Sequence, residues 1–427
     1  MRVWLHRHYH WIIALAMLLQ LAVYTGIGNN FNSLFVLPVT QGLNISRSSF
    51  SLALSLRQLI SFACTMISGA LFMHFGYRKL AMIALPLTAL AYMVLSMSQN
   101  AAMIAIGAGM IGFCDAICST AGATRVVNDW FHRHRGTVLG AVSAFTGVGG
   151  SLICILLTDV MDGSGWRGAY RCCGILVLAV AVLVVLLVRN RPEQMGLRPF
   201  GEGELPKKKR HGAVTEDHWP GFSMGELVRK PTFYLMLLCT LLGCMLCYFA
   251  FYTIVPHLQD QGLSSSEAAY IQSLMLMALT AAKLICGFLI DRIGARWVTG
   301  ICIACGAVGS WLLASATSMN SALLAIGIYT CSLSLTTITI PLLATRLFGF
   351  RAHGTAVGIF LSMVSVGGMV ASPLINGLYD LMGSYVPAYR GAAVGLLVVL
   401  GLYLLLFTLA EKDRARRYVQ QTGAESL

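Results

Sequence analysis

The stretch Ala281-Ala-Lys-Leu-Ile-Cys-Gly-Phe-Leu-Ile-Asp-Arg-Ile-Gly-Ala-Arg296 begins in an apolar helix and ends in a charged turn. Lys283 precedes Asp291 by about 12 Å of helix rise, at roughly 1.5 Å per residue. A lysine at that depth in a membrane costs about 2.5–3.5 kcal/mol on insertion scales, so its charge needs compensation. A bound anionic substrate would supply that compensation.

The composition is that of a helical membrane protein. The chain of 427 residues is 57% hydrophobic and 11% charged, whereas soluble domains carry about 25% charged residues. Twelve apolar segments are each about as long as the roughly 20 residues that cross a bilayer. They cover residues 11–37, 48–72, 80–98, 101–127, 137–160, 169–189, 233–257, 265–290, 297–317, 321–345, 355–379 and 391–410. We therefore predict an all-α membrane protein with twelve transmembrane helices.

The net charge of +13 follows membrane topology and does not indicate a nucleic-acid partner. With the N-terminus in the cytoplasm, most Lys and Arg residues fall on the tails, the cytoplasmic loops and the inner helix ends. The positive-inside rule then places both termini in the cytoplasm, and we expect the chain in a bacterial inner membrane. Most of the 13 Cys lie within apolar segments, which favours packing over disulfides.

We expect no metal site and no cofactor. His6, His8 and His10 alternate in the N-terminal tail, which also carries aromatic residues typical of an interfacial anchor. His132 and His134 are flanked by arginines that would repel a cation. Both histidine groups are therefore interpreted as solvated or interfacial.

An internal repeat relates the two halves of the chain. At an offset of 218 residues the sequence repeats glycine, proline and arginine positions: Gly69/Gly287, Gly76/Gly294, Arg78/Arg296, Pro38/Pro256 and Gly140/Gly358. Such a fixed offset indicates a repeat, and each repeat holds six segments, so both halves insert in the same orientation. We predict a six-helix bundle over 1–190, a cytoplasmic linker over 191–231, and a second bundle with a basic tail over 232–427.

Polar faces on four predicted helices favour a central aqueous cavity. Small polar residues also serve helix packing, but four such faces together are more typical of a water-filled pathway. With Arg57, we take these residues as candidates for substrate binding: Tyr24, Asn29, Tyr248, Tyr252, Gln272, Lys283, Tyr329, Ser332 and Thr336.

Arg57, Asp115 and Lys283 are the three ionisable residues that we count away from helix ends. Asp115 can pair with one cation, and Arg57, in the same half, is the expected partner. Lys283 then keeps a charge that a monoanionic carboxylate would neutralise. Two alternatives stay open: Lys283 pairs with Asp115, or it is neutral because burial disfavours a charged amine. Asp115 is also a candidate for proton coupling.

The quoted stretch resembles the loop signature of the major facilitator superfamily, with a degenerate first copy. The resemblance covers nearly the whole chain and implies the major facilitator fold. It also implies that the two loops gate conformational change, through Gly287, Asp291, Arg292, Gly294, Arg296, Gly69, Gly76 and Arg78. Within the superfamily the chain is most similar to the monocarboxylate transporter and oxalate–formate antiporter branch, through Gly42 to Ser48, Trp130-Phe131 and Arg191 to Gly201.

The branch resemblance implies a role for Lys283. Members of that branch carry an arginine four residues before the loop glycine, where it binds the substrate carboxylate, and Lys283 holds that place before Gly287. An ammonium is a point charge, whereas a guanidinium is a planar fork. The eleventh segment also has no lysine, unlike the oxalate transporters. These departures argue against oxalate as the substrate.

We therefore expect a monomeric secondary transporter for a small organic anion, a monocarboxylate, working in the lipid bilayer by alternating access with Lys283 as counter-charge. Protons or a counter-anion would be its coupling partners. One alternative is an efflux carrier for amphipathic or cationic drugs that uses Asp115. Another is a membrane sensor that does not transport. An enzyme is not expected, because no nucleophile–base set, metal cluster or phosphate loop is evident.

Overall fold

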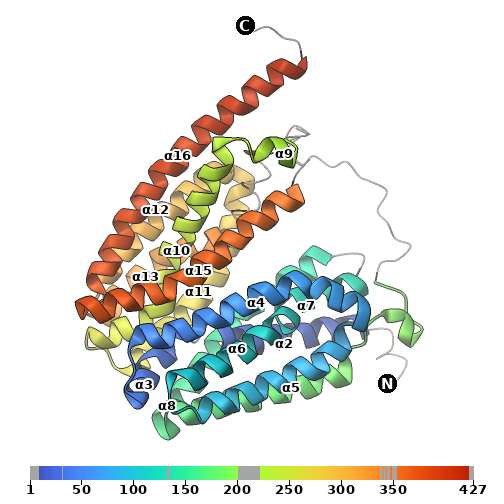
Figure 1. Cartoon of the computed structure of the whole chain (residues 1–427), viewed down its shortest axis with the longest axis vertical. Coiled ribbons are helices and arrows are strands. Elements are labelled where there is room, and N and C mark those ends of the chain that lie inside the picture. Colours follow the sequence, from blue (N-terminus) through green and yellow to red (C-terminus); the bar gives the residue numbers. More distant parts are fainter. Residues whose placement is uncertain are drawn as a thin grey trace. The chain divides into compact units, whose positions relative to one another are not determined.

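The computed structural model describes residues 9–30, 32–131, 135–200, 222–336, 340, 343, 347–348 and 353–422. Within these residues the regular elements are helices (Figure 1). The strand-like pairing found there is an isolated bridge between Phe131 and Phe200. The predicted all-α class is confirmed.

The helices follow the apolar segments of the sequence. The first half forms α2 (Tyr9–Asn30), α3 (Asn32–Leu43), α4 (Arg47–Phe75), α5 (Tyr77–Ser96), α6 (Ala101–Cys118), α7 (Thr120–Trp130) and α8 (Arg135–Leu187). The second half forms α9 (Met224–Leu227), α10 (Pro231–Asp260), α11 (Ser265–Ile293), α12 (Ala295–Ala314), α13 (Met319–Leu333), α15 (His353–Met382) and α16 (Val386–Thr422). Two short 3-10 helices cover Pro192–Met195 and Ser334–Thr336.

Nine helices in the described part of the chain are long and apolar enough to cross a membrane. One of them, Val138–Leu187, contains Gly165 at φ 68°, where two helices meet, so it accounts for two predicted segments. The 29-residue α4 and the shorter apolar α13 correspond to the remaining two of the twelve. The chain is a multi-pass helical membrane protein, as its composition predicts.

The internal repeat is visible in the backbone. Residues with positive φ occur in pairs 218 positions apart: Asn44 and Gly262, Gly76 and Gly294, and Gly165 and Gly383. The hydrogen bonds repeat as well, because the Gly76 N–H donates to Phe72 O at 3.1 Å and the Gly294 N–H donates to Ile290 O at 2.9 Å. The two halves make the same turns at the same positions, as the predicted internal repeat requires.

The chain forms two compact units that differ from the two sequence halves. Unit 1 comprises Met1–Lys209 and Tyr252–Thr280, and unit 2 comprises Arg210–Phe251 and Ala281–Leu427. The helices α10 and α11 therefore each contribute to both units. The helical hairpin between Tyr252 and Thr280 packs with unit 1.

Within unit 1, α2 packs against α8, α4 against α6, and α5 against α6 and α8 (Figure 1). Gly112 allows the close approach of α6 to α4, because a Cβ atom at this position would clash with the backbone carbonyl of Arg57. Small residues at such crossings let membrane helices pack backbone to backbone. The same crossing brings the polar side chains of α4 and α6 together.

Polar contacts hold the Tyr252–Thr280 hairpin within unit 1. Gln58 Nε2 donates to Tyr252 Oη at 3.0 Å. Arg47, the first residue of α4, donates to both carboxylate oxygens of Asp260, the last residue of α10, at 2.7 and 2.9 Å. Each charge lies at the helix end that the helix dipole disfavours for its sign. The ion pair therefore offsets the unfavourable interaction of each charge with the dipole of its own helix.

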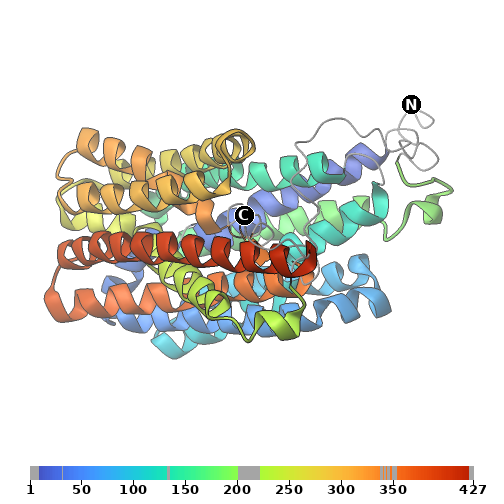
Figure 2. The same cartoon turned by 90° about the horizontal axis from the view of Figure 1, so that it is seen from above.

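Within unit 2, α12 packs against both α13 and α16, and Figure 2 shows α16 in red alongside this group. The α12–α16 contact is polar near the start of α12. Arg296 Nη1 donates to Glu411 Oε1 at 3.1 Å, and Tyr403 Oη donates to the Arg296 carbonyl at 3.2 Å. Lys230 and Asp413, 3.0 Å apart, form a further ion pair in this unit.

The conformation of Gly76 leads to a stability prediction. Its φ of 73° and ψ of 153° lie in a region essentially restricted to glycine, and other residues there cost about 1–3 kcal/mol. A Cβ atom would also meet the Asn190 side chain at 2.6 Å. We expect Gly76→Ala to lower the thermal unfolding temperature of the purified protein in detergent.

The matched control is Gly140→Ala. Gly140 is an exposed helical residue, and a Cβ atom there would have no neighbour within 4 Å. Alanine is preferred over glycine in helices, so this change should leave stability equal or slightly higher. Equal unfolding temperatures for Gly76→Ala and the wild type would refute the assigned turn geometry.

Candidate functional site

A buried ion pair joins α4 to α6 in unit 1. Arg57 Nε donates to Asp115 Oδ2 at 2.9 Å, and Arg57 Nη2 donates to Asp115 Oδ1 at 3.1 Å. Arg57 is 4% exposed and Asp115 is 8% exposed. A paired, doubly hydrogen-bonded geometry is what makes such burial tolerable. The expected pairing of Arg57 with Asp115 is confirmed.

The backbone of α2 completes this arrangement. Arg57 Nη1 donates to the carbonyl of Gly28. A Cβ atom on Gly28 would lie 2.5 Å from Arg57 Nη2, so glycine makes room for the guanidinium. The cation thus meets a carboxylate and a carbonyl within one buried site on α2, α4 and α6. The carboxylate of Asp115 is engaged here by Arg57.

Lys283 has a different environment. It is half-buried on α11, three residues after Thr280, the last unit 1 residue of that helix. Among the described residues, the ion pairs found join other side chains, and Lys283 takes part in none of them. Its charge is therefore not balanced by a described protein carboxylate.

The remaining candidates in unit 1 are buried. Tyr24 is 4% exposed and its Oη donates weakly to the Ile111 carbonyl at 3.5 Å. Tyr252 accepts from Gln58, and Gln272 is fully buried. The side chain of Asn29 lies outside the described residues. Tyr24 on α2 and Arg57 on α4 both hydrogen-bond to residues of α6. Tyr252 and Gln272 belong to the Tyr252–Thr280 hairpin.

The unit 2 candidates on α13 are buried and hydrogen-bond to backbone carbonyls. Tyr329 and Ser332 are both fully buried. Tyr329 Oη donates to the Cys247 carbonyl, and Ser332 Oγ donates to the Tyr329 carbonyl at 2.7 Å. Tyr248 is half-buried and its ring lies 6.0 Å from that of Phe251. The side chain of Thr336 lies outside the described residues.

The loop-signature residues form two similar turns with different polar contacts. In unit 1, Arg78 donates to the Val185 carbonyl from Nε at 3.2 Å and from Nη2 at 3.0 Å. In unit 2, Arg296 binds Glu411, and the Arg292 guanidinium lies 4.5 Å from the centre of the Phe288 ring. Gly69 lies within α4, the helix that ends at the Gly76 turn, and Gly287 lies within α11, the helix that ends at the Gly294 turn. The side chain of Asp291 is outside the described residues.

Sequence reasoning missed three polar features of the hairpin region: the Arg47–Asp260 pair, Gln58 and His257. His257 is fully buried in α10. A signal was available, because an ionisable residue in an apolar segment is a functional candidate by default. His257 is not among the sequence candidates because it is the last residue of the predicted segment 233–257. No sequence signal joins Arg47 to Asp260, which lie 213 residues apart.

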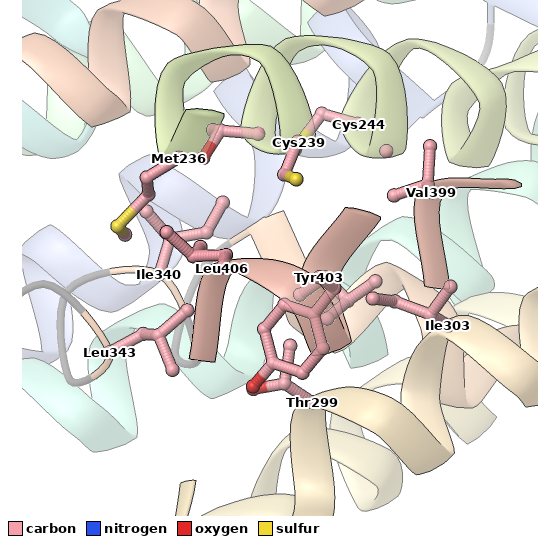
Figure 3. Close-up of a pocket in the computed structure, with 13 residues that line it drawn as sticks. Met236, Cys239, Cys244, Thr299, Ile303, Ile340, Leu343, Val399, Tyr403 and Leu406 are labelled. Carbon is pink, nitrogen blue, oxygen red and sulfur yellow. The ribbon is translucent and has the colours of Figure 1, made fainter. Parts of the chain in front are cut away.

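A small cavity lies inside unit 2, between α10, α12 and α16 (Figure 3). Its volume is about 40 Å³, and its lining includes Cys239, Cys244, Ile303, Val399 and Tyr403. Ligand pockets are typically about 300–1,000 Å³, so this cavity is too small for an organic substrate. None of the predicted substrate residues lines it. In the described part of the chain, no three His, Cys, Asp or Glu side chains gather as they would around a metal ion.

Comparison with known proteins supplies the family context. The sequence model of the Major Facilitator Superfamily matches residues 15–372 and 244–426. The chain is 24% identical to monocarboxylate transporter 11 of Homo sapiens, over 79% of this chain and 70% of the relative. It is 23% identical to the MFS transporter asaE of Aspergillus flavus, over 80% of this chain and 73% of the relative.

Solved structures agree in fold. A bacterial homologue of the human lysosomal transporter Spinster, crystallised in an inward-facing, unoccupied conformation, superposes with a TM-score of 0.72. Its sequence is 18% identical, and the match covers 95% of this chain and 98% of that one. At this identity the likeness establishes the helical architecture.

The Arg57–Asp115 pair yields a second prediction. Asp115→Asn removes the counter-charge of a buried guanidinium, and breaking a buried pair in this way costs about 3–5 kcal/mol. We expect a lower thermal unfolding temperature. The double variant Arg57→Leu/Asp115→Leu should recover most of the loss, because an apolar replacement of both partners is often neutral.

Asp159→Asn is the control, since Asp159 is exposed and should tolerate the change. If Asp115→Asn and Asp159→Asn unfolded at the same temperature, the prediction would be wrong and the ion pair would contribute nothing to stability.

Proposed function

Because the chain belongs to the Major Facilitator Superfamily and is a secondary transporter rather than an enzyme, we propose that it carries a small organic anion. The observation behind this proposal is the half-buried position of Lys283, for which the described ion pairs provide no carboxylate partner. A carboxylate substrate would neutralise that charge and form a charge-assisted hydrogen bond to the ammonium.

The Arg57–Asp115 pair supports an anionic over a cationic substrate. Asp115 is the acidic residue that a drug cation would need, and both of its oxygens accept hydrogen bonds from Arg57. The neutral pair leaves a net positive charge at Lys283 among the three ionisable residues singled out from the sequence. A monoanion balances one such charge, so we propose a monocarboxylate. The similarity to a monocarboxylate transporter is consistent with this class.

The position of Lys283 in α11 suggests how binding is coupled to movement. The helix α11 contributes to both compact units, and Lys283 lies three residues past the change from one unit to the other. A ligand bound to Lys283 would contact α11 close to the point where the helix passes from unit 1 to unit 2. We propose that neutralisation of Lys283 favours the occluded state of the carrier and so drives alternating access.

Several finer features belong to the same proposal. Both termini lie in the cytoplasm, the membrane is a bacterial inner membrane, the carrier is a monomer, and protons or a counter-anion couple to transport. We further propose that Arg57 and Asp115 support the substrate site by fixing α2, α4 and α6. In this assignment Asp115 holds Arg57 in place instead of carrying the coupled proton.

The test is uptake of labelled monocarboxylates into proteoliposomes. Lys283→Gln should lower the affinity for substrate by about ten-fold or more, because a hydrogen bond to a charged group contributes about 1.5–3 kcal/mol. Lys283→Arg keeps the charge and should retain part of the uptake. The control is Lys412→Gln, since Lys412 is exposed on α16.

Uptake by Lys283→Gln equal to that of the wild type would remove Lys283 from the mechanism. Uptake of organic cations that depends on Asp115, with none of carboxylates, would favour the drug-efflux alternative instead.

A further inference from the structure

Two thiols of unit 2 lie in contact inside the helical bundle. Cys286 Sγ on α11 and Cys302 Sγ on α12 are 3.7 Å apart, and both cysteines are free. Cys286 is 4% exposed and Cys302 is 1% exposed. Closing this gap to a disulfide bond of about 2.0 Å needs an approach of roughly 1.7 Å.

The sequence places these thiols in register. The turn between α11 and α12 is at Gly294, and Cys286 and Cys302 lie at equal distances before and after it. Residues equally far from such a turn lie at the same height on two antiparallel helices. Cys305 and Cys331 are likewise symmetric in sequence about Ser318, the residue that caps α13.

The internal repeat shows that the fold does not require these thiols. At the offset of 218 residues, Cys286 and Cys302 correspond to Ser68 and Ala84 in unit 1. The same helical hairpin is therefore built there around Gly76 without either cysteine. A small packing residue would satisfy the geometry, so the paired thiols of unit 2 call for another explanation.

We propose that Cys286 and Cys302 form a dithiol modification site that a hydroperoxide oxidises to a disulfide. One thiolate attacks the peroxide O–O bond and becomes a sulfenic acid, while the other peroxide oxygen leaves as water or alcohol. The second thiol then attacks that sulfur and displaces water, forming the S–S bond. Two thiols lose two electrons and two protons, and one hydroperoxide is reduced. Such an oxidant is small and uncharged, which suits an apolar surrounding.

The disulfide would act on transport through α11. Cys286 lies about one turn from Lys283, and α11 contributes to both compact units. Bonding α11 to α12 restricts the helix that carries the substrate counter-charge. This consequence rests on the proposed function, whereas formation of the disulfide does not.

The experiment is peroxide treatment of the full-length protein in liposomes, followed by alkylation under denaturing conditions, proteolysis and mass spectrometry. We expect a cross-link between the peptides that contain Cys286 and Cys302, with loss of two hydrogens, reversible by a phosphine reductant. Cys302→Ser should abolish the cross-link. Cys172→Ser, which changes a half-buried thiol on α8, should leave it intact.

Full alkylation of both thiols after peroxide treatment, or oxidation of Cys286 to sulfinic acid alone, would overturn the site. Monocarboxylate uptake by the wild type should fall at least two-fold on oxidation and recover on reduction, while uptake by Cys302→Ser stays constant. A cross-link without a change in uptake would uphold the dithiol site and overturn its coupling to Lys283. Uptake that is independent of Lys283 would overturn the proposed substrate site and leave the cross-link result unaffected.

Discussion

The structure depends on the neutralisation of one buried guanidinium. Arg57 lies in the apolar interior of unit 1, where an unpaired charge would be strongly destabilising. Asp115 supplies the opposite charge through two hydrogen bonds, and the Gly28 carbonyl accepts a third. Three helices converge on this residue as a result. Because Arg57 engages both oxygens of Asp115, this carboxylate is not the counter-ion of Lys283.

The helices and the repeat were predictable because their signals are local. Apolar length identifies the membrane segments, and glycine at Gly76 and Gly294 reflects backbone angles that other residues rarely adopt. The Arg57–Asp115 pair was predictable because only three ionisable residues were counted away from the ends of the predicted helices, and one of them is acidic. The assignment of the Tyr252–Thr280 hairpin to unit 1 was not predictable. It depends on contacts such as Gln58 with Tyr252, 194 residues apart, which leave no pattern in the sequence.

Helical polar stripes proved less informative about the site. Tyr329 and Ser332 share one face of α13, and periodicity alone does not distinguish a cavity from a helix contact. In the structure, Gly309 and Gly306 on α12 leave room for Tyr329 and Ser332 respectively, so both residues lie against α12. His257 escaped notice for a different reason. It stands at a segment end in the sequence, yet α10 continues past it to Asp260 and buries it fully.

The two halves share turns but not the charges within their apolar segments, since Arg57, Asp115 and Lys283 have Met275, Leu333 and Thr65 at the equivalent positions. The Arg47–Asp260 contact extends this asymmetry to the helix ends. The Arg47 side chain is only 10% exposed, so dissolved ions, which screen exposed charges over about 8 Å at physiological ionic strength, weaken this contact little. Any movement that separates the two residues would bring both charges into contact with the electrolyte. The salt concentration would therefore change mainly the electrostatic energy of the separated state, in which counter-ions surround Arg47 and Asp260. Higher salt should then favour separation of the two residues.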